Sequence, residues 1–257
     1  MPAMQFFDPG SAAFASAFGK LMAATDERVW IARLVEDVLG GASSEVRRNL
    51  ADIGCGSGGN FPKFLELGFS VLGVEPNEDL RTIATNAWGS DPRVTIVEGK
   101  AEKFSAPAGF ETFDAAAMIF VDHHLPHLLH TAGAILESIV RGGKLLLVNN
   151  AVQSPIMQLH ERLGHVGRPL ETVHQLRSSP FVESVCYRQF SGPTFKFPDE
   201  DSLWEVARFV AGDHMEDYPS APTEADFERA VQELFLPEGL QPTGLSTPLD
   251  VVIVTRK

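Results

Sequence analysis

A glycine-rich segment that follows an apolar run is the part of this sequence best suited to bind a ligand. The segment extends from Asn49 to Gly59 and carries Gly54, Gly56 and Gly58 in alternation. Glycine accepts positive φ and lets the backbone approach a ligand closely. A glycine-rich loop that leaves a strand and opens a helix therefore predicts a cofactor site at the edge of a sheet.

Two acidic residues indicate which kind of cofactor this loop would accept. Asp52 lies two residues before the first glycine, and Glu75 ends the next apolar run, 21 residues after Gly54. A carboxylate beside the loop would repel the pyrophosphate of a dinucleotide, whereas it would favour a cationic group. S-adenosylmethionine, which has a sulfonium and an amino group and no phosphate, meets this requirement. Glu75 is expected to accept hydrogen bonds from both ribose hydroxyls.

Four histidines lie close together further along the chain, at His123, His124, His127 and His130. Imidazoles three or four residues apart share one face of a helix, which is a spacing that metal sites use. No cysteine lies nearby and Asp122 is the only carboxylate beside them. The sequence therefore predicts no metal site, and His127 and His130 are expected to be surface or packing residues.

Strands and helices alternate around these residues, as expected for a doubly wound α/β domain with a mostly parallel sheet. Two amphipathic helices are expected first, over 11–24 and 26–39, with Thr25 as the cap of the second. The alternating part contains expected strands at 49–53, 70–74, 94–97, 115–121 and 144–148, and helices at 60–67, 77–88 and 131–141. Further helices are expected at 154–163, 169–177, 200–210 and 223–235, with strands at 182–190 and 249–255.

We interpret the chain as one domain with three parts. Residues 1–45 form an N-terminal helical cap, residues 46–150 the cofactor-binding core, and residues 151–257 a helical lid followed by the last strands of the same sheet. The final strand is expected to be antiparallel to the others. It has to pair with the sheet, because an exposed run of Val and Ile would promote aggregation.

Several motifs in order resemble those of the class I S-adenosylmethionine-dependent methyltransferases that act on small molecules. The resemblance covers roughly Leu50 to Asn149. The segments that carry it are Asp52-Ile-Gly-Cys-Gly-Ser-Gly58, Gly73-Val-Glu-Pro-Asn77, Glu98-Gly-Lys-Ala-Glu-Lys-Phe104, 113–125 and Gly142-Gly-Lys-Leu-Leu-Leu-Val148. The resemblance implies a Rossmann-like fold and S-adenosyl-L-methionine as the cofactor.

The resemblance also implies a set of site residues. The cofactor contacts it implies are Asp52, Gly54, Cys55, Gly56, Gly58, Glu75, Pro76, Ala101, Glu102, Ile119 and Phe120. Cys55 is expected to contribute only its backbone, since neither a base nor a second thiol accompanies it. His124, and secondarily His123, would face the transferring methyl group. Either residue would act as a general base or only line the pocket.

The charge of the chain bears on its partners. The formal net charge is −13, and the segment Asp199–Glu238 holds twelve acidic residues against Arg208 and Arg229. This excess disfavours a nucleic acid partner. The acidic segment is interpreted either as solvated helix faces or as an entrance that attracts a cationic substrate. The aromatic residues that would line an apolar acceptor pocket, or else pack in the core, are Phe7, Phe14, Phe18 and Trp204.

Three functions stay open at this level. The first is methyl transfer to O, N or C of a small-molecule acceptor, cationic or apolar, with a biosynthetic role. The second is an NAD(P)-dependent oxidoreductase, which GxGxxG favours and Asp52 opposes. The third is a non-catalytic protein that binds a nucleoside cofactor. Two distant cysteines and the absence of a long apolar run predict a cytoplasmic monomer or homodimer without a membrane partner.

Overall fold

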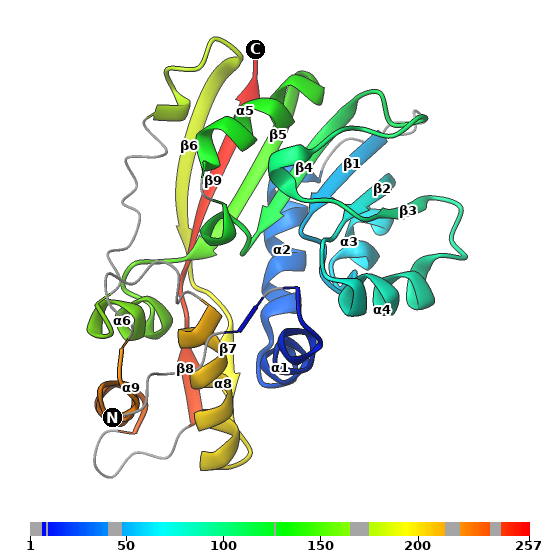
Figure 1. The fold of residues 1–257 in the computed structure, drawn as a ribbon. Helices are drawn as coiled ribbons and strands as arrows, with labels where there is room; N and C mark the ends of the chain where they lie inside the picture. Colours follow the sequence, from blue (N-terminus) through cyan, green and yellow to red (C-terminus); the bar gives the residue numbers. More distant parts are fainter. Residues whose placement is uncertain are drawn as a thin grey trace. The chain divides into compact units, whose positions relative to one another are not determined.

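The structure is a computed structural model, and Figure 1 shows it as a ribbon. It describes residues 7–8, 10–40, 48–125, 127–164, 175–213, 222–236 and 243–257. Contacts divide the chain into two compact units. The sheet unit comprises Trp30–Asn149, Pro169–Arg188 and Val251–Lys257, and the helical unit comprises Met1–Val29, Asn150–Arg168 and Gln189–Asp250.

The sheet unit is built on a seven-stranded sheet with the order β3-β2-β1-β4-β5-β9-β6. The strands are β1 (Arg48–Ile53), β2 (Phe69–Val74), β3 (Val94–Val97), β4 (Phe113–Ile119), β5 (Ile139–Asn150), β6 (Val182–Phe190) and β9 (Leu249–Arg256). The pairs β1–β2, β1–β4, β2–β3 and β4–β5 are parallel. The arrow of β9 runs against that of β5 in Figure 1, so the sheet has the expected antiparallel strand. The chain order reverses direction between β1 and β4, and the carboxyl edge there is where sheets of this kind bind ligands.

Helices cover both faces of this sheet, which explains why β2 is buried throughout and β4 over most of its length. One face packs against α5 (Leu128–Ser138), whose Ile135 and Leu136 share a core with Ala51 and Ile53 of β1. On the other face, Lys144 donates through Nζ to the carbonyl of Val38 in α2 (Glu27–Leu39) at 2.7 Å. Strands between two helical layers bury both sets of side chains.

Two further helices follow the strands that carry the candidate site. These helices are α3 (Phe61–Glu66), after β1, and α4 (Glu78–Trp88), after β2. The side chain of Asn77 caps α4 by accepting from the amide of Leu80 at 3.0 Å. Because this cap begins the helix two residues after Glu75, the end of β2 is held in a fixed backbone conformation.

The helical unit has an apolar core of its own. Its helices are α1 (Ala12–Ala23), α6 (Pro155–Arg162), α8 (Glu200–Asp213) and α9 (Glu224–Phe235). They pack with a two-stranded antiparallel sheet formed by β7 (Thr194–Lys196) and β8 (Thr243–Ser246). Phe227, Leu203 and Leu159 are fully buried at the centre of this core. Thr223 opens α9 with a capping box completed by Asp226.

Most expected elements are confirmed within a few residues, and two points differ. The helix expected at 131–141 ends at Ser138, because Ile139 is fully buried in β5 and pairs with Phe113 of β4. The strands β7 and β8 are not predicted, since each has only three or four residues. The helix expected at 169–177 lies mostly outside the described residues. Within the described ranges, no helix combines the length and hydrophobicity needed to cross a bilayer.

Candidate cofactor site

The glycine loop takes a conformation that only glycine adopts without strain. The φ angles of Gly54, Gly56 and Gly58 are 71°, 55° and 75°. The amides of Gly54 and Cys55 donate to the carbonyl of Val74 at 2.8 and 3.2 Å, which ties the loop to the end of β2. The predicted turn at the carboxyl end of β1 is therefore present, and it is anchored to the neighbouring strand.

Close packing restricts the loop further. A Cβ atom placed on Gly54 would lie 2.5 Å from Cγ2 of Val121, and one on Gly58 would lie 2.9 Å from Cδ1 of Trp88. Both distances are shorter than a normal carbon contact. Glycine is required at these two positions by the backbone angle and by the neighbouring side chains.

Gly54→Ala is expected to destabilise the fold more than Gly68→Ala does. Gly68 has a φ of 83°, and a Cβ atom placed on it would meet nothing within 4 Å, so its replacement by alanine carries only the backbone strain, about 1–2 kcal/mol. Gly54→Ala adds the clash with Val121, worth about 1–3 kcal/mol more. Urea unfolding of both variants, with Val121→Ala completing a double-mutant cycle, separates the two contributions. Equal losses in free energy of unfolding for the two glycine variants would show that Val121 does not restrict the loop.

Glu75 is fixed in place by backbone amides. Its Oε2 accepts from the amide of Gly56 at 2.8 Å and its Oε1 from the amide of Asn77 at 2.9 Å. Arg81 donates to the carbonyl oxygens of Glu75 and Pro76 at 2.9 and 3.0 Å. Burial raises the pKa of Glu75. The hydrogen bonds from the amides of Asn77 and Gly56, and the charge of Arg81, partly oppose that rise. Each carboxylate oxygen keeps a second lone pair, so both can still accept from hydroxyl groups.

Asp52 is the most unusual group in the site. Only 1% of its surface is exposed, and its Oδ2 has no hydrogen-bond partner among the described residues. Burial, and then the charge of Glu75, raise the pKa of Asp52 to about 7. A buried carboxylate without a partner is costly unless a cation or hydrogen-bond donor completes it. The site therefore fits a ligand that brings such a group to Asp52.

Cys55 contributes no reactive thiol. It is buried, and burial, followed by the charges of Asp52 and Glu75, raises its pKa well above the usual value. The thiolate is the nucleophilic form, so this cysteine is inert at neutral pH. That only its backbone serves the loop stays a prediction.

The other expected cofactor contacts follow β3 and β4. Ala101 and Glu102 lie in a short helix, η1 (Ala101–Lys103), where Ala101 is buried in the core shared with α5. Ile119 is the buried last residue of β4. Phe120 follows with a φ of 55°, the one described non-glycine residue with a positive φ, and strain of this kind is typical of functional sites. The carboxyl ends of β1 to β4 thus carry all the expected cofactor residues, each at the same edge of the sheet.

The two candidate catalytic histidines lie in the turn after β4. This turn is a short helix, η2 (Asp122–His124), in which the ring centroids of His123 and His124 are 3.9 Å apart. Both carboxylate oxygens of Asp122 accept from Nδ2 of Asn149, at 2.8 and 2.9 Å. Asn149 is near the end of β5, so a neighbouring strand holds the turn. Sequence reasoning missed this role of Asn149, although a polar pair, Asn149 and Asn150, ending a buried strand was the available signal.

The remaining histidines and aromatic residues named in the sequence analysis lie on other elements. His127 precedes α5 and His130 lies in its first turn, and both are exposed. No group of possible metal ligands occurs in the part of the chain that the structure describes. Phe7, Phe14 and Phe18 belong to the helical unit. There, Phe7 and Phe14 pack edge-on against Phe209, and Phe14 stacks on Phe18.

The profile of the methyltransferase-domain family matches residues 23–192, about two thirds of the chain. The chain belongs to this family. A protein of Alkaliphilus oremlandii named as an uncharacterised methyltransferase is 34% identical over 106 residues, which cover 40% of this chain and 46% of that protein. This chain therefore spans less than half the length of such relatives.

Solved methyltransferase structures share the fold of this family member. One is described as a methyltransferase from an antibiotic biosynthesis pathway of Anabaena variabilis. It is 20% identical with a TM-score of 0.58, over 88% of this chain and 97% of that one. Another is phosphoethanolamine N-methyltransferase 2 of Haemonchus contortus, in complex with phosphomonomethylethanolamine and S-adenosylhomocysteine. It is 13% identical with a TM-score of 0.54, over 93% of this chain and 52% of that one. These likenesses, together with the family match, confirm the resemblance to class I methyltransferases.

Proposed function

We propose that this protein is an S-adenosylmethionine-dependent methyltransferase that transfers a methyl group to O, N or C of a small-molecule acceptor, in a biosynthetic pathway. The observation that carries the proposal is the buried Oδ2 of Asp52, which has no hydrogen-bond partner among the described residues and lies beside a loop of glycines with positive φ. A carboxylate in that position favours a cofactor that presents a cation, and it opposes a pyrophosphate. Family membership and fold support the same reading.

The residues divide the work of holding the cofactor. Glu75 would accept hydrogen bonds from the ribose hydroxyls with the lone pairs that the amides of Gly56 and Asn77 leave open. Asp52 would meet a cationic group, which also removes the energetic cost of its burial. The loop glycines leave room for close approach of the amino-acid part. Ala101 and Glu102 would lie against the adenine, and Ile119 and Phe120 beside the sulfur.

The bound cofactor would supply a methyl group already activated by its sulfonium. The remaining task of the protein is to align the acceptor, exclude water and accept a proton where the acceptor carries one. His124, in the turn after β4 with His123 beside it, would take that role. The Asp122–Asn149 contact would keep the turn, and with it His124, in one orientation.

Glu75→Ala is expected to weaken cofactor binding by about 2–4 kcal/mol, since hydrogen bonds to a charged acceptor are strong. Glu98→Ala is the matched control, because Glu98 is an exposed carboxylate that pairs with the same Arg81 at 3.5 Å. Calorimetric titration with S-adenosylhomocysteine measures both variants. An analogue without ribose hydroxyls should bind the parent and Glu75→Ala alike. Retention of full affinity by Glu75→Ala would remove this residue from the ribose site.

Turnover tests the proposed activity as a whole. The protein is incubated with S-adenosylmethionine carrying a labelled methyl group and with a panel of phenols, amines and activated carbon acids. Formation of S-adenosylhomocysteine together with one labelled acceptor would support methyl transfer and would identify the atom. If the cofactor binds but no acceptor in a broad metabolite extract is labelled, the result would support the non-catalytic alternative instead.

A cytoplasmic location stays a prediction.

A further inference from the structure

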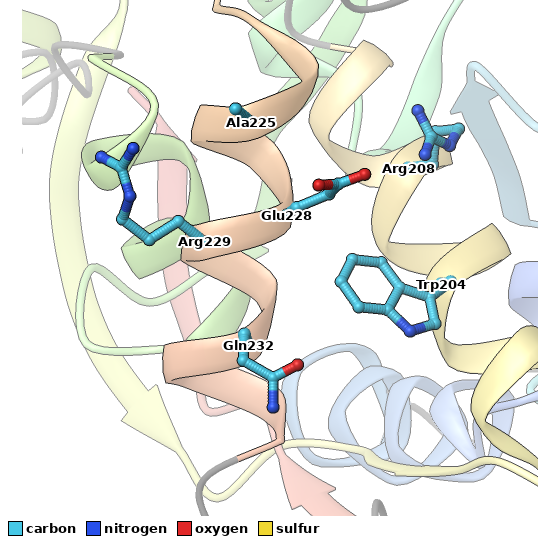
Figure 2. A pocket seen from close by; sticks show the side chains of 6 residues that line it. All are labelled: Trp204, Arg208, Ala225, Glu228, Arg229 and Gln232. Carbon is cyan, nitrogen blue, oxygen red and sulfur yellow. The ribbon is translucent and has the colours of Figure 1, made fainter.

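A groove separates α8 from α9 in the helical unit. It encloses about 490 Å³ and is lined by Trp204, Arg208, Ala225, Glu228, Arg229 and Gln232 (Figure 2). Trp204 and Arg208, one turn apart on α8, form one wall. The other wall is formed by residues of α9 that are three or four positions apart, namely Ala225, Glu228, Arg229 and Gln232. The volume is in the range that small organic ligands occupy.

The two arginines of the groove already have anionic partners. Nη1 of Arg208 lies 2.7 and 2.6 Å from the two carboxylate oxygens of Glu224, and its guanidinium lies 4.8 Å from the ring centroid of Phe227. Arg229 forms an ion pair with Asp226 at 3.7 Å. Since each positive charge is matched by a carboxylate, the groove offers little attraction to an anionic ligand.

Glu228 is the one groove carboxylate without such a partner. No hydrogen bond or ion pair joins it to another residue in the described part of the chain. Figure 2 shows its carboxylate pointing from α9 toward α8, into the space between Arg208 and Trp204. An unpaired, solvent-exposed negative charge therefore borders the groove.

Trp204 offers the groove its ring surface. Its Nε1 donates to Glu200 at 3.1 Å, so the polar end of the indole is already satisfied. The ring packs edge-on against Phe227, with centroids 6.0 Å apart and an angle of 67° between the planes. This contact holds the indole in one orientation beside Glu228. A rigid aromatic face next to a carboxylate is the arrangement that binds alkylated ammonium groups.

We propose that this groove binds a small organic cation, a quaternary ammonium or protonated amine, between the ring of Trp204 and the carboxylate of Glu228. The wider charge distribution supports the same class of ligand. The helices α8 and α9 carry Glu200, Asp201, Glu205, Asp213, Glu224, Asp226, Glu228 and Glu233 against Arg208 and Arg229. Such a field raises the local concentration of cations. The proposal does not rest on methyl transfer and concerns the helical unit alone.

Choline and its neutral isostere 3,3-dimethylbutan-1-ol test the proposal, because the two probes share their shape and differ in charge. Calorimetric titration of the full chain is expected to show saturable binding of choline and at least tenfold weaker binding of the alcohol. Added sodium chloride should weaken choline binding, since salt screens the acidic field. Equal binding of both probes would identify an apolar groove and overturn the proposal, as would failure of choline to bind at millimolar concentration.

Two variants and a control locate the site. Glu228→Gln and Trp204→Leu are each expected to weaken choline binding at least fivefold. Glu233→Gln removes the same charge from the same helix. Because Glu233 pairs with Arg162 outside the groove lining, the affinity of this variant for choline should equal that of the parent. Glu228 is exposed, and its variant should keep the thermal unfolding midpoint of the parent. Choline affinity that is the same in Glu228→Gln as in the parent would overturn the assignment. Tighter binding of inorganic phosphate than of choline would also overturn it, in favour of an anion site at the arginines.

Discussion

Asp52→Asn is expected to abolish tight binding of S-adenosylmethionine while making the cofactor-free fold less sensitive to alkaline pH. The loss of affinity is expected to be about 100-fold, because a buried charge partner contributes roughly 2–5 kcal/mol to a complex. Asn keeps the shape of Asp and removes the charge, while one acceptor oxygen becomes an NH2 donor. Calorimetric titration of both proteins with the cofactor measures this loss.

The stability effect follows from the pKa of Asp52, which burial raises from its usual 3.8 to about 7. Below pH 4 the carboxyl holds its proton in the folded and the unfolded chain, so it makes no difference to stability. As pH rises from 4 to 7, the unfolded chain loses the proton first, and stability falls. Above pH 7 the decrease in the free energy of unfolding is complete, at about 4 kcal/mol, since each unit of pKa corresponds to about 1.4 kcal/mol.

Urea unfolding at pH 4 and pH 8 isolates this contribution. The parent should lose about 4 kcal/mol more than Asp52→Asn between the two pH values, and any fixed cost of the buried amide cancels in the difference. The parent's affinity for S-adenosylmethionine should also fall as pH drops below 7, because binding requires the carboxylate. An identical pH dependence of unfolding in the two proteins would show that Asp52 titrates normally.

His124→Ala is expected to lower kcat by about 10²–10⁴-fold if the acceptor is a hydroxyl or an ammonium group, because such nucleophiles must lose a proton. Affinity for S-adenosylmethionine should change little, since His124 is proposed to contact the acceptor and not the cofactor. The kcat/KM of the parent should rise with pH through an apparent pKa that the variant lacks. Initial rates from pH 5.5 to 9 measure both effects.

His123→Ala and His130→Ala are the controls for that experiment. His123 adjoins His124 in the same turn, whereas His130 lies exposed in α5. His130→Ala should leave kcat unchanged, and a pH profile altered only in His123→Ala would transfer the role to that residue. A small decrease in kcat that does not vary with pH, in both His123→Ala and His124→Ala, would indicate that the histidines only line the pocket. Full activity in both would remove them from the mechanism.

The sheet and the cofactor loop could be predicted because local sequence determines them. Alternating glycines after β1 require positive φ, and apolar runs such as Val71 to Val74 can only be buried. The Asp52 and Glu75 positions follow from the ends of those strands. Parallel strands bring their carboxyl ends to one edge, so residues far apart in the chain could be placed in one site.

Contacts between distant side chains could not be predicted in the same way. The Asp122–Asn149 contact joins two strand ends 27 residues apart, and each residue alone is typical of a loop. The groove between α8 and α9 depends on how two helices pack, which hydrophobic periodicity does not specify. Short strands such as β7 and β8 lack enough residues to show an alternating pattern.

Competitive calorimetry with S-adenosylhomocysteine and NADH tests the central claim most directly. The parent protein is titrated at pH 7.5 with each ligand, and then with one in the presence of the other. We predict binding of S-adenosylhomocysteine with one site per chain and no measurable binding of NADH, because Asp52 would repel the pyrophosphate. Saturable binding of NADH that displaces S-adenosylhomocysteine, or that occurs without any binding of S-adenosylhomocysteine, would contradict the assignment of this loop to S-adenosylmethionine.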